Sequence, residues 1–160
     1  MSVESNIQAD VKRVGWSAIL VTDDPPFAYT IGLMFTFSHP ELIIFGLRDQ
    51  GHPILSTMVE VLREGGSFVP GKRYSDVLNG FDIAVREVDP SQHTEYLGYA
   101  MGYCRERGRI GELEALEVFW PDKGGHYPFE ASCIEPIRAL QPRLDLPLGT
   151  TARRRITKRL

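Results

Sequence analysis

The stretch from residue 25 to residue 47, PPFAYTIGLMFTFSHPELIIFGL, constrains the fold of this chain more than any other. It contains two strongly apolar runs, Phe27–Phe37 and Leu42–Leu47, separated by Ser38–Glu41 (SHPE). The second run is short and almost entirely apolar, which is typical of a strand buried on both faces. The sequence therefore predicts that residues 42–47 form a central strand of a sheet.

The residues before this stretch predict a β-hairpin. Trp16–Thr22 (WSAILVT) is rich in the branched and aromatic residues that favour strands. Asp23–Pro26 (DDPP) ends that strand, because Asp favours turns and proline cannot donate a backbone hydrogen bond. Phe27–Leu33 should then return beside the first strand. Gly32 within it predicts a bulge, or a close approach by another backbone or a ligand.

A short helix is predicted at the N-terminus. Ser5 and Gln8 have the spacing of a capping box, and an apolar stripe follows them. Gly15 can end this helix in a left-handed conformation. The later elements are predicted as a helix from Pro53 to Gly65, a strand at Phe81–Val88, a helix from Asp89 to about Arg107, and a strand at Leu113–Trp120 with one face in water.

These elements predict an α+β protein. At 160 residues the chain is long enough for one domain with a proper core. We expect a single globular domain over residues 1–141, with a mostly antiparallel sheet of about five strands and two main helices. The order of the elements is similar to that of small flavin-binding split barrels, a likeness at the level of the fold. Residues 142–160 are expected to be an extended to disordered basic tail.

Charge is distributed unevenly along the chain. The net charge is −3, yet the last ten residues carry five cations and no acid, which leaves −8 for the rest. An acidic body makes sequence-specific nucleic-acid binding improbable. The tail is either solvated or contacts an anionic partner. Its cations are Arg153, Arg154, Arg155, Lys158 and Arg159.

The sequence predicts a cytoplasmic protein. No apolar run approaches the ~20 residues of a membrane helix, and the N-terminus has no hydrophobic signal core. Cys104 and Cys133 are far apart and fit no metal spacing, so they are expected to be reduced thiols.

The best candidates for chemistry lie in the central stretch. His39 and Glu41 are the candidate catalytic residues, because a carboxylate beside a histidine raises its pKa and orients its ring. The alternative is that the two side chains form a hydrogen-bonded clasp that fixes the turn. His52 could join them as a metal ligand, but no pair has the helical spacing of a zincin, so no metal site is predicted. The ligand-binding candidates are Tyr29, Thr30, Gly32, His52, Trp120 and Asp122.

Other catalytic signatures are absent from the sequence. It has no Gly-x-Ser-x-Gly elbow, no Walker motif and no Gly-x-Gly-x-x-Gly fingerprint. Two hypotheses therefore stay open. The first is a non-catalytic domain that binds a small molecule or another protein. The second is an enzyme, or a flavin- or metal-binding protein, that uses the corner at His39 and Glu41, with Lys72 and Arg73 directed at a cofactor's phosphate.

A homodimer is also expected. Gly98 and Gly102 flatten one face of the predicted helix beside Tyr96, Tyr99 and Tyr103. Small residues next to aromatic rings suit a two-fold interface between copies of the chain.

Three motifs resemble those of a known family. PPFAYTIGL, HPELIIFGL and WPDKGGHYPF occur in the order found in a bacterial family of small proteins catalogued as domain of unknown function 4262. The resemblance covers about Gly15 to Phe129 and implies no activity. The last motif often ends in Phe-Pro-Trp in the family, whereas this chain has Tyr127–Phe129 (YPF), which weakens any role for an indole there. The chain beyond Ile134 has no counterpart in the resemblance.

Overall fold

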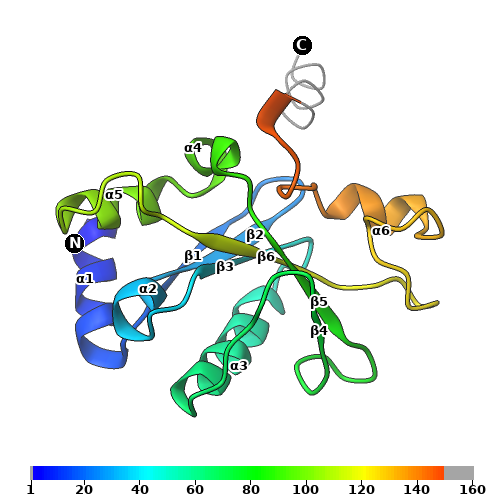
Figure 1. The fold of residues 1–160 in the computed structure, drawn as a ribbon, viewed down its shortest axis with the longest axis horizontal. Coiled ribbons are helices and arrows are strands. Elements are labelled where there is room, and N and C mark those ends of the chain that lie inside the picture. The colour runs from blue at the N-terminus through cyan, green and yellow to red at the C-terminus, as the bar shows by residue number, and fades with distance from the viewer. Residues whose placement is uncertain (1, 150–160) are drawn as a thin grey trace.

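The computed structural model describes residues 2–149, which form one sheet with helices on both faces (Figure 1). The strands are β1 (Ser17–Val21), β2 (Phe27–Ile31), β3 (Glu41–Phe45), β4 (Arg73–Tyr74), β5 (Ile83–Glu87) and β6 (Ala115–Phe119). The helices are α1 (Val3–Val14), α2 (Leu33–Thr36), α3 (Gly51–Arg63), the 3-10 turn η1 (Pro90–Gln92), α4 (His93–Tyr96), α5 (Gly98–Glu106) and α6 (Glu135–Leu140). The predicted α+β class is confirmed.

The sheet is mixed and has six strands in the order β1-β2-β3-β6-β5-β4. β3 and β6 run parallel, with Glu41 opposite Ala115, while the other neighbours are antiparallel. The prediction of a mostly antiparallel sheet of about five strands is therefore wrong. The chain leaves β3, forms α3 and the β4–β5 hairpin, and only then returns as β6 beside β3. The sheet is open, with β1 and β4 at its edges, and does not close as a split barrel would.

The two faces of the sheet carry separate apolar cores, because side chains alternate along each strand. One face packs against α3 through residues such as Ile44, Leu55 and Met58. The other face packs against α1, α4 and α5 through Tyr29 and Phe45 among others. Every residue of β3 is buried. The prediction that this strand is central and buried on both faces is confirmed.

The N-terminal helix ends as predicted. Gly15 adopts φ +91°, and its N–H donates to the carbonyl of Val11 at 2.8 Å. The start differs from the prediction, because the capping residue is Ser2, whose hydroxyl accepts the N–H of Ser5 at 3.1 Å. Ser5 therefore lies inside the helix, and the serine three residues earlier caps it.

The second strand is shorter than predicted. β2 ends at Ile31, and Gly32 turns the chain with φ +105° into the four-residue helix α2. The predicted close approach at Gly32 is confirmed, because a Cβ there would lie 2.9 Å from a methyl of Val11 and 3.3 Å from the carbonyl oxygen of Gly15. The predicted bulge is a turn.

The long predicted helix from Asp89 to Arg107 is interrupted. Leu97 leaves helical geometry (φ −119°, ψ 35°) between α4 and α5. Its side chain is completely buried in the core beneath the two helices.

The predicted wet face of residues 113–120 is wrong. All of β6 is buried, and Glu117 is 1% exposed. The chain after α6 covers it: Leu144 is fully buried, and its N–H donates to the Glu117 carboxylate at 2.8 Å. The segment expected to be an extended tail from residue 142 thus packs against β6 at Leu144. The basic run with Arg153, Arg154, Arg155, Lys158 and Arg159 lies outside the described residues.

No helix among residues 2–149 has both the length and the apolar character needed to span a membrane.

Candidate functional site

The corner at Glu41 brings together three of the predicted site residues. Glu41 begins β3 and is 2% exposed. One carboxylate oxygen accepts the hydroxyl of Thr30 at 2.8 Å and the N–H of Leu33 at 3.2 Å. The other accepts the N–H groups of Gly32 at 3.1 Å and Met34 at 3.3 Å. The carboxylate therefore holds the turn from β2 into α2.

The hydrogen bonds of this corner form a closed network. The Thr30 hydroxyl donates to Glu41 and accepts the N–H of Leu42 at 2.9 Å. Burial raises the pKa of Glu41 to about 7, while the four donors oppose this rise by stabilising the charge. Glu41 thus exchanges its proton near neutrality, and the four donors that bond to it are all protein groups.

His39 has a different set of partners. Its Nδ1 lies 2.8 Å from the carbonyl oxygen of Pro40, and its Nε2 accepts the N–H of Phe68 at 2.9 Å. Because Phe68 donates to Nε2, the proton of the neutral ring is on Nδ1 and donates to Pro40. The ring is buried and ties the loop after α3 to the start of β3.

The two candidate catalytic residues are therefore not a pair. Within the described residues no hydrogen bond joins the side chains of His39 and Glu41, and each is satisfied by backbone or by Thr30. General acid–base catalysis requires a group within reach of a substrate proton. At this corner the ring and the carboxylate are both buried, and their contacts hold backbone segments together.

Two further candidates lie elsewhere. Tyr29 is buried under α5, where its hydroxyl accepts the N–H of Tyr99 at 3.2 Å, and burial raises its pKa to about 12. His52 is exposed at the start of α3 and stacks on Trp16, with ring centroids 5.5 Å apart.

Trp120 and Asp122 organise the chain after β6. The indole N–H of Trp120 donates to the carbonyl of Phe45 at 2.8 Å. The Asp122 carboxylate accepts the N–H groups of Gly124, His126 and Ile134 at 2.9, 3.0 and 3.1 Å. The hydrogen bond from His126 is the main reason that the pKa of Asp122 is lowered. Both side chains fix loop geometry.

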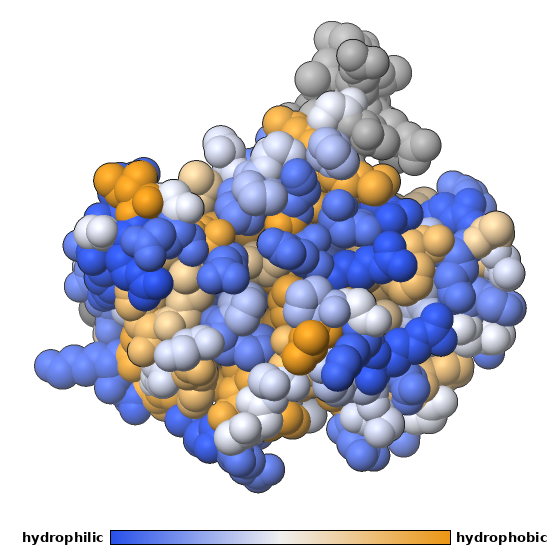
Figure 2. Space-filling model, in the orientation of Figure 1, coloured by the Kyte–Doolittle hydropathy of each residue, from blue (hydrophilic) through white to orange (hydrophobic). Residues whose placement is uncertain are grey.

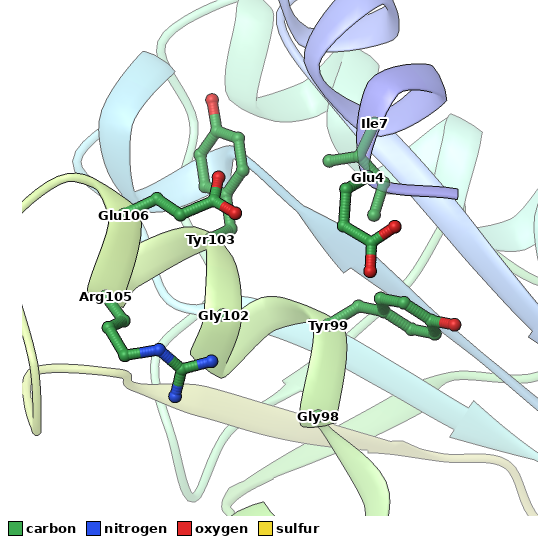
Figure 3. A pocket seen from close by; sticks show the side chains of 8 residues that line it. All are labelled: Glu4, Ile7, Gly98, Tyr99, Gly102, Tyr103, Arg105 and Glu106. Carbon is green, nitrogen blue, oxygen red and sulfur yellow. The ribbon is translucent and has the colours of Figure 1, made fainter. Parts of the chain in front are cut away.

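A cavity lies between α1 and α5, away from the corner at His39 and Glu41 (Figure 3). It has a volume of about 290 Å³, close to the lower end of ligand pockets. The lining residues are Glu4, Ile7, Gly98, Tyr99, Gly102, Tyr103, Arg105 and Glu106. We call this cavity the α1/α5 groove.

The floor of the α1/α5 groove is bare backbone. Figure 3 shows Glu4 extending from α1 towards α5 and Tyr99 lying beneath it, with Gly98 and Gly102 on the surface of α5. A Cβ at Gly98 would meet nothing within 4 Å, and one at Gly102 would meet only the Arg105 guanidinium at 3.6 Å. The protein itself therefore gives no packing reason for either glycine.

The groove combines apolar surface with charges of both signs. Ile7 is 3% exposed, whereas Tyr99 is 40% exposed. Within the described residues, neither the carboxylate of Glu4 nor the guanidinium of Arg105 has an ion-pair partner. Glu106 accepts a hydrogen bond from Gln8 of α1 at 3.2 Å, which joins the two helices at one end.

The sequence predicted only the α5 face of this groove. It identified the flat face at Gly98 and Gly102 and the tyrosines beside it. It missed Glu4 and Arg105, because nothing in the sequence shows that α1 crosses α5. The two segments are about a hundred residues apart in the sequence, and only the folded chain brings them into contact.

The described residues offer little for metal or thiol chemistry. In residues 2–149 no three side chains of His, Cys, Asp or Glu lie close enough together to hold a metal ion. Cys104 and Cys133 are free and buried, and burial raises the pKa of both thiols. A raised pKa reduces the thiolate fraction that a nucleophile needs.

Comparison with known proteins gives one match. A family model described as Domain of unknown function (DUF4262) matches residues 10–134. No curated protein matches the chain, and no solved structure does. The match ends at the start of α6 and leaves the first part of α1, including Glu4 and Ile7, outside it.

Proposed function

The chain belongs to the DUF4262 family, and we propose that it is a non-catalytic binding domain whose α1/α5 groove holds a small amphipathic molecule. The observation that supports this proposal is a groove of about 290 Å³ with two helix glycines as its floor. Glycine within a helix costs up to ~1 kcal/mol relative to alanine. A ligand that lies directly on the backbone of α5 provides a reason for that cost.

The charges suggest the chemistry of the ligand. Glu4 and the exposed ring of Tyr99 lie together on one side of the groove, an arrangement that attracts an ammonium group. Arg105 lies beside Gly102 and can accept a carboxylate through its planar fork. Ile7 and the glycine backbone suit an apolar body between these ends. The ligand class is a small zwitterion with an apolar side chain, such as a free amino acid.

The corner at His39 and Glu41 supports the enzyme hypothesis less well. Its polar atoms bond to backbone and to Thr30, and none of its residues lines the groove. A cofactor-dependent reaction at this corner would require these contacts to open.

The test is titration calorimetry of the purified protein with a panel of aromatic and aliphatic amino acids. We expect saturable binding of at least one apolar amino acid, and weaker binding of its decarboxylated and its N-acetylated forms. Gly102→Leu, which fills the floor, should abolish binding. Thr57→Ala, an exposed substitution on α3, is the matched control and should leave binding unchanged.

Two outcomes would contradict the proposal. The first is a panel in which no member binds. The second is a particle in light scattering of about twice the 18.0 kDa mass of the chain that Gly102→Leu converts to monomer. That result would assign the groove to a homodimer interface instead.

A further inference from the structure

A second cavity lies on the other side of the molecule, where β4 and β5 meet the loop after β6. It has a volume of about 150 Å³, and its lining includes the three consecutive residues Gly71, Lys72 and Arg73, together with Arg86 and Phe129. Figure 2 shows strongly hydrophilic side chains gathered over this part of the molecule, around β5 and towards α6. The groove between α1 and α5 shares no residue with it.

Aromatic rings fix the two arginines of this cavity. The guanidinium of Arg73 lies 4.4 Å from the ring centroid of Tyr127, and that of Arg86 lies 3.7 Å from that of Phe129. The two rings are themselves stacked, with centroids 5.5 Å apart and an interplanar angle of 8°. Packing over a ring restricts the motion of a guanidinium, so both groups are partly pre-organised to donate.

Most of the donors of these arginines are unused. A guanidinium has five N–H donors. Arg73 donates one hydrogen bond, to Glu130 at 3.3 Å, and Arg86 donates one, to Asp145 at 3.2 Å. No other acceptor for either group, and no ion-pair partner for Lys72, occurs among residues 2–149. Most of the N–H donors of these two arginines thus have no acceptor in the part of the chain that the structure describes.

The local charge is positive although the body of the protein is acidic. Arg143 lies 2.7 Å from Asp145. The four cations Lys72, Arg73, Arg86 and Arg143 therefore outnumber the carboxylates of Glu130 and Asp145 here. Asp82 near Tyr127 reduces the excess without cancelling it. Burial raises the pKa of the neighbouring Glu117 well above its usual range, so that carboxyl adds little negative charge.

We propose that this cavity binds a phosphate group, either as free phosphate or at the end of a small molecule. Two arginine forks and a lysine suit the several oxygens and the double charge of a phosphate better than a single carboxylate. Phe129 also lines the cavity and is only partly buried, so the exposed part of its ring would contact the body of a phosphomonoester.

The test is calorimetry of the full chain with inorganic phosphate and with phenyl phosphate at constant ionic strength. We expect saturable binding, weakened at least about tenfold by Arg73→Gln and by Arg86→Gln, since each removes charge-assisted hydrogen bonds. Asp145→Asn should instead strengthen binding, because it releases Arg86 from its competing carboxylate. Tighter binding of phenyl phosphate would identify a phosphomonoester as the ligand, and equal affinity would identify the phosphate group alone.

The matched control is Arg109→Gln. Arg109 also pairs with a carboxylate, Glu112 at 3.1 Å, and lies 5.2 Å from the ring centroid of Phe35, but it lines neither cavity. It should leave phosphate binding unchanged, as should Gly102→Leu in the groove. Absence of saturable binding to the wild type would overturn the proposal. So would equal weakening by Arg73→Gln and Arg109→Gln, because that result indicates non-specific attraction.

Discussion

The corner at Glu41 and the α1/α5 groove are opposites in how they treat polar groups. At the corner a carboxylate is 2% exposed and accepts four hydrogen bonds from the residues around it. In the groove, Glu4 and Arg105 have no ion-pair partner among residues 2–149, and the only atom within 4 Å of a Cβ added at Gly98 or Gly102 is in the Arg105 guanidinium. The polar groups of the corner are satisfied within the protein, whereas those two charges of the groove have no ion-pair partner among the described residues.

The contrast between the corner and the groove shows that residue type alone is a poor guide to a binding or catalytic site. Histidine, glutamate and threonine within a few residues suggest catalysis, yet here each of them fixes backbone. A buried polar group must find partners because leaving it unpaired costs ~1–3 kcal/mol, and a corner that meets this requirement internally has little left for a substrate. The floor of the groove, in contrast, is open because Gly98 and Gly102 have no side chains to fill it.

The largest effect is expected for Glu41→Ala. This change removes the acceptors of four buried donors, the Thr30 hydroxyl and three backbone N–H groups. At ~1 kcal/mol for each unsatisfied donor, the free energy of unfolding should fall by roughly 4 kcal/mol. Urea denaturation measures it. A loss below ~1 kcal/mol would show that the corner is not the closed structural network described here.

The next effect is a pH dependence of stability. The pKa of Glu41 is about 7 in the folded protein, above its ordinary value of 4.5, so the folded state retains a proton that the unfolded state releases. The stability that this proton contributes is complete below the ordinary pKa and is lost as pH rises through about 7.

The magnitude follows from the pKa difference. At ~1.4 kcal/mol per pKa unit, the stability of wild type relative to the non-titrating variant Glu41→Gln should fall by about 3 kcal/mol between about pH 4 and pH 8. Comparing the two proteins removes the contribution of Glu117, whose pKa is raised in the same direction. Parallel curves for the two proteins would contradict the prediction.

A smaller effect is expected for His39→Ala. This change leaves the N–H of Phe68 and the carbonyl of Pro40 without partners, so the free energy of unfolding should fall by about 2 kcal/mol. Binding in the groove should be unchanged in the folded protein, because His39 does not line it. Loss of ligand binding with unchanged thermal stability would contradict this prediction and would indicate a functional role for His39.

The smallest effect, and the only increase in stability, is expected for Gly102→Ala. The helix should be stabilised by up to ~1 kcal/mol, since the added methyl group has room on α5. The same methyl group enters the floor of the groove and should weaken ligand binding several-fold. Thermal denaturation measures the change in stability, and calorimetry measures the change in affinity. Weaker binding together with lower stability would indicate simple misfolding of α5.

Local patterns predicted the elements of the fold but not their partners. The apolar run at residues 42–47 predicted a central buried strand, and Gly15 predicted the end of α1; both are confirmed. The alternation of residues 113–120 predicted a wet face, which is wrong, because Leu144 covers Glu117 from 27 residues away. The residues close to β6 in the sequence give no sign that Leu144 buries Glu117.

The sequence by itself determined periodicity, caps and turns, because these depend on neighbours within a few residues along the chain. Only the tertiary structure decided which polar groups are satisfied and which remain available. The four donors that surround Glu41 lie seven to eleven residues away from it, and the two walls of the α1/α5 groove are about a hundred residues apart. The energy of a polar group depends on whether water or protein provides its partner, and that is settled by packing rather than by residue type.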